Sequence, residues 1–298
     1  MKRNDFWKTF FITTLIKISG YSAIFFVLMI LIFLIGQGLP ALSQIEFSSL
    51  FSERWYPTED YFGILPLIGG SLVVTIGATL IAVPLGLGTA IFISEIAPRW
   101  AREILKPMVE LLAGLPSVVL GFIGIVSLSP MIREYLNLPT GLSALTGSML
   151  LGAIAVPTIV SVAEDALDSV PREYRDAALA LGATEWQTIW SVTLPAARSG
   201  VLTAVMLGIA RAIGETMTVM MVTGNAAVMP DGLATLFSPI RTMTATIAAE
   251  MGEVAEGSPH YHVLFLIGII LFLISLIINI SASSVIFKKT NRAEKILS

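Results

Sequence analysis

Two opposite charges inside a mainly apolar stretch are the residues best suited to chemistry in this sequence. Arg211 and Glu215 lie within residues 199–223, with Arg211 about midway along the stretch. An unpaired arginine at the centre of a bilayer costs about 2.5–3.5 kcal/mol on insertion scales, so its presence there indicates a function. A guanidinium fork can hold an oxyanion through two parallel hydrogen bonds. We therefore expect Arg211 to carry an anion along a wet path, and Glu215 to keep Arg211 from trapping it.

The same two charges permit a simpler interpretation. Residues four apart share one face of a helix, so Arg211 and Glu215 could pair with each other and only hold helices together. A residue on another span could also neutralise the charge. Acid-base chemistry is less favoured, because an arginine stays protonated. The sequence has no cysteine and only two histidines, His260 and His262. We therefore expect no catalytic residue and no metal site, and an enzyme is the least favoured class.

Arg241 is a weaker candidate for contact with an anion. It follows Ser238 and Pro239 and precedes several threonines. A Ser-Pro pair is typical of a helix N-terminus, and a helix N-terminus with an arginine and hydroxyls would suit an anion that arrives from outside. An arginine on an interfacial helix needs no ligand, so this alternative stays open.

The composition is that of a membrane protein. Hydrophobic residues make up 55% of the 298 residues and charged residues only 13%, against about 25% charged residues in soluble domains. The net charge of −3 gives no basic surface for nucleic acid. No soluble segment of useful size is left over, so we expect one domain, residues 1–298.

Six apolar segments are long enough to cross a bilayer, which takes about 20 residues of helix. The expected spans are residues 21–39, 64–94, 107–131, 141–162, 199–223 and 263–287. The first apolar run is too long for a cleaved signal peptide. The sequence therefore predicts an all-α, polytopic membrane protein with six transmembrane helices.

The distribution of lysine and arginine predicts the orientation of these spans. Segments on the side of the two termini carry 14 of these residues, and the other side carries three, Arg54, Arg133 and Arg241. Cytoplasmic loops are enriched in lysine and arginine. We therefore expect both termini and the polar segment 164–198 in the cytoplasm, and residues 225–262 outside.

The polar segment 164–198 contains a spaced motif. An acidic residue and two alanines are followed, after three intervening residues, by a glycine. Nine further residues separate this glycine from an aliphatic residue, and one more residue separates the aliphatic residue from a Leu-Pro pair. These positions are Asp176, Ala177, Ala178, Gly182, Val192, Leu194 and Pro195. The pattern resembles the EAA loop of ABC-importer permeases, with aspartate in place of glutamate and valine in place of isoleucine. Both replacements keep the charge or the shape.

The residues of this segment predict an elbow of two short helices. Pro171 favours a helix start and Gly182 can take the positive φ that ends the helix. In the second helix Trp186 and Trp190, four residues apart, share one face. The resemblance implies a coupling helix that docks into a cytoplasmic ATPase, as in MetI-like, type I importer permeases. An amphipathic helix lying on the membrane, with tryptophan at the interface, is the alternative.

Four further sequence blocks indicate which family of importer permeases the chain resembles. They are Trp55-Tyr56-Pro57 followed by Phe62, Gly63 and Pro66; Arg-Ala-Ile-Gly-Glu-Thr-Met at 211–217; Arg-Thr-Met-Thr-Ala at 241–245; and Glu-Met-Gly-Glu at 250–253. Together they resemble the PstC family, permeases of the bacterial high-affinity phosphate importer. The likeness covers nearly the whole chain. It implies a multi-pass protein of the bacterial inner membrane, surrounded by lipid, that moves inorganic phosphate inward by alternating access.

The resemblance also implies partners. They are a PstA-like sister permease in a heterodimer, two copies of a PstB-like ATPase under the elbows, and a PstS-like phosphate-binding protein on the outer face. The chain has no glycine-rich Lys-Ser/Thr phosphate loop, so ATP and Mg are expected in the ATPase and no cofactor in this chain. Two alternatives stay open: a permease for another oxyanion, such as sulfate or molybdate, and a phosphate-sensing membrane scaffold that transports nothing.

Overall fold

The structure is a computed structural model that describes the backbone of residues 3–297 and the side chains of residues 10–280. The expected basic residues of positions 1–9 and of the tail, and the last part of the span expected at 263–287, lie outside the described side chains. Within the described residues, six helical segments are long and apolar enough to cross a membrane, which confirms the predicted number. They are Phe10–Gln44, Leu65–Ile96, Ser117–Leu136, Ala144–Asp168, Glu185–Gly214 and Pro259–Ile280.

The described part of the chain is mostly helical, with one small hairpin. The helices are α1 (Arg3–Gly38), α2 (Ala41–Gln44), α3 (Phe47–Leu50), α4 (Leu65–Ile91), α5 (Arg99–Ala113), α6 (Ser117–Ile123), α7 (Ser129–Leu136), α8 (Ala144–Asp168), α9 (Arg172–Ala180), α10 (Glu185–Thr188), α11 (Leu194–Gly214), α12 (Met217–Val222), α13 (Met243–Glu250) and α14 (Pro259–Leu297). The strands β1 (Trp55–Tyr56) and β2 (Tyr61–Phe62) pair antiparallel. Three π-helical segments continue helices, at Phe92–Ile96, Gly124–Leu128 and Ile189–Thr193.

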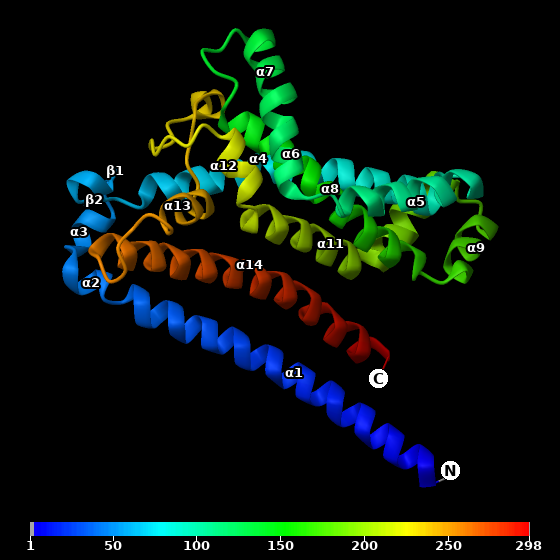
Figure 1. Ribbon diagram of the computed structural model, residues 1–298. Helices are drawn as coiled ribbons and strands as arrows, with labels where there is room; N and C mark the ends of the chain where they lie inside the picture. Colours follow the sequence, from blue (N-terminus) through cyan, green and yellow to red (C-terminus); the bar gives the residue numbers. More distant parts are fainter. Residues whose placement is uncertain (1–2, 298) are drawn as a thin grey trace.

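The centre of the molecule is the pair α4 and α8, on which α11 packs (Figure 1). Small residues let these helices approach closely, as is common in membranes. A Cβ atom at Gly86 would lie 2.7 Å from Ile159 Cγ2, so no larger residue fits there without movement. Helix α14 lies beside α11, and α1 lies beside α14, so α1 forms the edge of the bundle (Figure 1).

The two ends of the bundle differ in structure. At one end the β1–β2 hairpin packs with α13 and the start of α14 around Trp55, Phe62, Met243 and Val263, all buried. At the other end α9 turns the chain between α8 and α11, and the start of α1 and the end of α14 lie toward this same end (Figure 1). We call these the hairpin end and the elbow end.

The first, third and fifth spans have different bounds from those predicted. The first, expected at 21–39, runs from Phe10 to Gln44. The segment expected at 107–131 runs from Ser117 to Leu136, and residues 107–113 belong instead to α5, which packs along α8. The cause is Pro116, because a proline disfavours α-helical backbone at the residue before it. The segment expected at 199–223 runs from Glu185 to Gly214, followed by the separate α12. The turn between spans therefore covers only residues 169–184, not the whole of 164–198.

Candidate functional site

Arg211 lies in the last turn of α11 and joins three helices. Its Nη1 donates a hydrogen bond to Thr158 Oγ1 of α8 at 3.0 Å, and its Nη2 donates to the carbonyl of Ala113, the last residue of α5, at 3.3 Å. The side chain forms no ion pair with any described carboxylate. A guanidinium has five N–H donors, so the remaining donors of this partly exposed arginine are available to an anion.

Glu215 does not pair with Arg211, although the two residues are four apart in sequence. Helix α11 ends at Gly214 and Glu215 has extended backbone, with ψ of 129°, so the two side chains do not share a helical face. Glu215 Oε1 instead accepts from the backbone N–H groups of Thr216 and Thr218, at 3.2 and 3.3 Å. The carboxylate therefore satisfies the first N–H groups of α12, and the interpretation of a mutual ion pair is wrong.

Two helix breaks lie side by side around these residues. One is at residues 114–116, between α5 and α6, and the other is at residues 215–216, between α11 and α12. Arg211 reaches the first break through Ala113, and Thr218 Oγ1 donates to the carbonyl of Ser117 at 2.9 Å. Non-helical backbone at membrane depth is tolerated where protein or a water-filled cavity surrounds it. Such interrupted helices line the binding sites of many transporters.

A small cavity beside Glu215 is lined by hydroxyl groups. Ser71 and Thr75 come from α4, and Thr242 and Thr244 come from the start of α13. Thr244 Oγ1 donates to the carbonyl of Glu215 at 3.1 Å, and so ties α13 to the break after α11. The polar lining therefore extends from the break toward α4.

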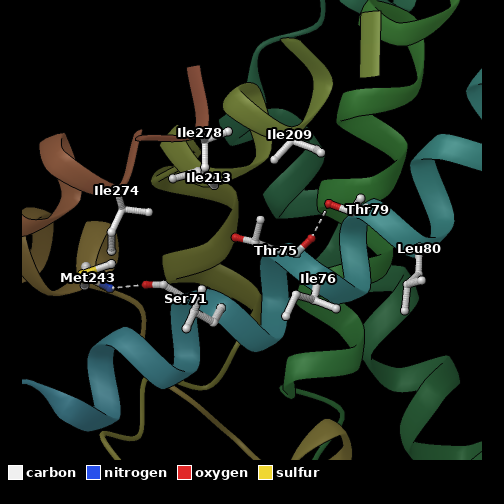
Figure 2. A pocket seen from close by; sticks show the side chains of 11 residues that line it. Ser71, Thr75, Ile76, Thr79, Leu80, Ile209, Ile213, Met243, Ile274 and Ile278 are labelled. Carbon is white, nitrogen blue, oxygen red and sulfur yellow. Dashed lines mark hydrogen bonds between the residues drawn. The ribbon is translucent and has the colours of Figure 1, made fainter. Parts of the chain in front are cut away.

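Figure 2 shows an open groove next to this cavity, between α4, α11 and α14. Its walls are almost wholly apolar; Ile209 and Ile213 come from α11, and Ile274 and Ile278 from α14. The hydroxyl of Ser71 accepts from Met243 N at 2.9 Å, and no charged side chain among the described residues lines the groove. A surface of this kind suits lipid hydrocarbon and not an anion, so the groove is not the path expected from Arg211.

Arg241 is tied to its own protein, unlike Arg211. Helix α13 begins at Met243, with Thr242 as its N-cap, and not at the Ser-Pro pair as predicted. Arg241 Nε donates to Asn225 Oδ1 at 3.3 Å, and Nη1 forms an ion pair with Glu250, at the far end of α13. Its charge is already neutralised within the fold, which favours the alternative in which this arginine needs no ligand.

Glu250 is the centre of a cluster that the sequence did not reveal. Besides Arg241, its carboxylate accepts from Trp55 Nε1 at 3.1 Å and lies 2.8 Å from His260 Nε2. The cluster joins the hairpin, both ends of α13 and the start of α14. These residues are up to 205 positions apart, from Trp55 to His260, so no local pattern could have indicated the contact.

The first helix of the elbow has the predicted form, but the second does not end as a separate short helix, because α10 continues through the π-helical segment Ile189–Thr193 into α11. Helix α9 ends before Gly182, whose φ of +86° is in the left-handed region that glycine tolerates. Thr184 and Gln187 form a capping box that starts α10. Trp186 and Trp190 stack edge to face, with ring centroids 5.6 Å apart, and both are exposed.

The predicted coupling residues divide into two groups. The first group is exposed at the surface of the elbow. Asp176, Ala177 and Gly182 are exposed on the turn, Trp186 is exposed on α10, and Ala178 is partly exposed. Leu194 and Pro195 instead form the first turn of α11, where Leu194 packs against the buried core. The exposed apolar side chains of the elbow are Tyr174, Leu179, Leu181, Trp186 and Trp190, of which Leu181 is 90% exposed.

Arg175, next to the predicted contact residue Asp176, holds the elbow to the bundle. Its Nε donates to Glu95 Oε2 at 3.1 Å and its Nη2 donates to Glu95 Oε1, so the pair is bidentate. The same guanidinium donates to the carbonyls of Val170 and Leu167 at the end of α8, at 2.7 and 2.9 Å. A charged residue directly after a long apolar run, as Glu95 is, was the available sequence signal.

More ion pairs lie near the contact between Arg175 and Glu95. Lys106 Nζ of α5 lies 3.3 Å from Glu164 Oε1 and 3.3 Å from Asp165 Oδ1, both of α8, and Glu164 is buried. Burial by itself would lower the pKa of Lys106, but the hydrogen bond and charge of Glu164, and then those of Asp165, outweigh burial and raise the pKa of Lys106 above 10.5. Helix α5 is therefore held along α8 by charge.

Comparison with known proteins places this fold. Residues 82–289 match the family of binding-protein-dependent transport system inner membrane components. The chain belongs to this family. Its members are transport components and not enzymes, and they work with an ATPase and a substrate-binding protein. The chain is accordingly a multi-pass protein of the inner membrane.

Relatives of this family cover most of the chain. The sequence is 44% identical to the probable ABC transporter permease protein YqgH of Bacillus subtilis, over 83% of this chain and 80% of that protein. It is 38% identical to the phosphate transport system permease protein PstC of Mesorhizobium japonicum, over 80% of this chain and 77% of that protein.

Solved structures share the fold at low sequence identity. A bacterial alginate ABC transporter, solved with a pentasaccharide-bound periplasmic protein, superposes with a TM-score of 0.63 at 16% identity and covers 93% of this chain and 95% of that chain. The inward-facing MetNI methionine ABC transporter superposes with a TM-score of 0.58 at 19% identity, over 74% of this chain and 92% of that chain. The predicted MetI-like permease fold is therefore confirmed.

Proposed function

We propose that this chain is the PstC-type permease subunit of an ATP-driven importer that moves inorganic phosphate into the cell. Relatives named as phosphate permeases match most of the chain, which supports the choice of substrate. The observation that carries the proposal is Arg211, a cation without an ion pair among the described residues, beside two helix breaks. We treat residues 1–298 as one permease domain.

Arg211 provides the contact to the anion. Its free N–H donors can bind two phosphate oxygens in parallel, a geometry that a point charge such as lysine does not offer. Thr158 and the carbonyl of Ala113 fix the guanidinium in the space between α5, α8 and α11. Glu215 stays close in the chain and adds negative charge, so a phosphate bound at Arg211 is held weakly enough to leave.

The elbow provides the contact to the ATPase. Its exposed apolar side chains, including Leu181 and Trp186, form a surface of the kind that another protein covers. In the proposed orientation the elbow and both termini are cytoplasmic. ATP and Mg bind in the ATPase, and this chain carries neither. Closure of the ATPases then moves the elbows and opens the path outward, and hydrolysis resets it.

The proposed assembly has four kinds of subunit. This chain pairs with a sister permease of the PstA type, and two PstB-type ATPases lie under the two elbows. A PstS-type phosphate-binding protein delivers the anion at the hairpin end. The apolar surface of the bundle that remains is covered by membrane lipid.

Radiolabelled phosphate uptake tests the proposal. Phosphate-starved cells that lack the chain should lose high-affinity uptake, and the chain supplied in trans should restore it. Excess arsenate should compete, because it has the shape and charge of phosphate, and excess sulfate should not. Competition by sulfate or molybdate would identify the permease of another oxyanion instead. Uptake that survives deletion while phosphate signalling changes would identify a scaffold that does not transport.

A further inference from the structure

Arg175 makes a joint between three helices at the elbow end. The residue belongs to α9, it binds Glu95 at the end of α4 through both carboxylate oxygens, and it binds two carbonyls at the end of α8. These contacts use four of the five N–H donors of a guanidinium. The Glu95 side chain is only 7% exposed and that of Arg175 is 20% exposed. The guanidinium therefore faces into the bundle and not toward a partner.

Helices α4 and α8 connect this joint to the candidate path. Ser71 and Thr75 of α4 line the cavity beside Glu215, and a helix of this length places Glu95 about 36 Å from Ser71. Thr158 of α8 holds Arg211. Because α4 and α8 pack closely, as at Gly86 and Ile159, the two helices move together. A displacement at the elbow end thus reaches both walls of the path.

The backbone at the joint departs from regular α-helix. Glu95 and Ser94 lie in the π-helical segment Phe92–Ile96, and a second π-helical segment, Ile189–Thr193, leads from the elbow into α11. Single π-helical turns occur often at functional sites. Arg102 donates to the carbonyl of Ser94, and Ser94 Oγ donates to Asp168 at 2.6 Å. The segment is therefore held in place by side chains of α5 and α8.

We propose that the bidentate pair Arg175–Glu95 transmits the movement of the elbow to α4 and α8, and so couples ATP hydrolysis to transport. Arg175 is a positioning residue, with Glu95 as its anchor, and neither touches the ATPase or the anion. The inference rests on the proposed coupling role of the elbow and does not depend on phosphate being the substrate. Without the pair, the elbow still docks on the ATPase and ATP is still hydrolysed, but α4 does not move with the elbow.

The test uses the complete importer in proteoliposomes, with Glu95→Gln as the main variant and Glu103→Gln as its matched control. Glutamine keeps the size of Glu95 and removes its charge. Glu103 is an exposed glutamate of α5, close to the same end, with no hydrogen bond or ion pair to another described side chain. Phosphate transported and ATP hydrolysed are measured on the same sample. We expect Glu95→Gln to lower phosphate moved per ATP by about tenfold, within the usual range of coupling energies, and the control to keep the wild-type ratio.

Hydrogen–deuterium exchange provides a readout that needs no substrate. A non-hydrolysable ATP analogue should change exchange in residues 169–184 and 92–97 together in the wild type, and only in 169–184 in Glu95→Gln. Arg175→Lys keeps the positive charge but loses the two-pronged contact, so it should give an intermediate ratio of phosphate transported to ATP hydrolysed. If Glu95→Gln fails to assemble, Arg175→Lys serves as the test variant. An unchanged ratio with both segments still responding overturns the proposal. If the wild-type importer moves no phosphate, the assignment of phosphate as the substrate is wrong. The hydrogen–deuterium exchange measurement then decides by itself whether the Arg175–Glu95 pair couples the elbow to α4.

Discussion

Between Arg211 and Glu215 the backbone leaves the α-helix, and the two side chains bond to different elements. Arg211 donates to Thr158 of α8, whereas Glu215 accepts from N–H groups at the start of α12. The positive charge is thereby left without a carboxylate partner among the described residues, at a point where two interrupted helices meet. This arrangement gives Arg211 the capacity to bind an anion that a paired arginine would lack.

Replacing Arg211 with glutamine should abolish most phosphate uptake. The change removes a charge-assisted, two-pronged contact worth about 1.5–3 kcal/mol, and so should lower uptake by about ten- to hundredfold. Membrane insertion and co-purification of the ATPase should be unchanged. The matched control is Arg133→Gln, on the exposed surface of α7. Normal uptake by Arg211→Gln would falsify the assignment of the path.

Two substitutions of Glu215 separate its structural role from its charge. Glutamine keeps an oxygen that accepts from Thr218 N, whereas alanine leaves the first N–H groups of α12 without this partner. Loss of such a cap costs about 1 kcal/mol. Glu215→Ala should therefore lower the thermal unfolding temperature in detergent, and Glu215→Gln should keep it but slow phosphate release. Equal unfolding temperatures for alanine and glutamine would exclude the capping role.

The pair Arg241–Glu250 should behave as a stabilising contact of the hairpin end. Glu250→Gln leaves Arg241 partly buried without its counter-charge, and should destabilise the protein by about 1–3 kcal/mol. Glu250→Gln combined with Arg241→Met should cost less than the sum of the two single changes, because the pair is removed as a unit. Thermal unfolding of the four proteins measures the coupling. Strict additivity would show that the two residues do not interact.

Leu181→Ser should weaken association with the ATPase without destabilising the permease. The side chain is 90% exposed, so its removal changes little within this chain. Full burial of a leucine side chain is worth about 1.5–3 kcal/mol, so removing Leu181 from a contact with the ATPase should measurably weaken that contact. Leu233, 82% exposed at the hairpin end, provides the control. Retention of the ATPase during purification should fall for Leu181→Ser alone, and an equal loss for Leu233→Ser would contradict the assignment of the elbow.

The contribution of Lys106 to stability should disappear at high pH. The folded protein raises the pKa of this lysine through Glu164 and Asp165, so the charged pair stabilises the fold fully below pH 10.5 and is lost as the pH rises through the higher pKa of the folded state. Lys106→Met should unfold at a lower temperature than the wild type at neutral pH. The difference should shrink well above pH 10.5, and a difference that stays constant would show that packing and not charge is responsible.

The sequence by itself determined the class of the protein, the number of its spans and the position of the elbow. These properties follow from local signals: long apolar runs, the positive φ available to Gly182, and the four-residue spacing of Trp186 and Trp190. Each signal lies within one continuous stretch of the sequence, and can therefore be recognised without knowledge of how distant parts of the chain pack.

Tertiary structure alone decided which charges meet. The spacing of Arg211 and Glu215 predicted a pair, but the break after Gly214 separated them, and Arg211 found Thr158 on another helix. Arg175 met Glu95, 80 residues away. A side chain of either charge can be satisfied by any partner that packing brings within reach, so these contacts depend on how distant helices cross, which no local pattern contains.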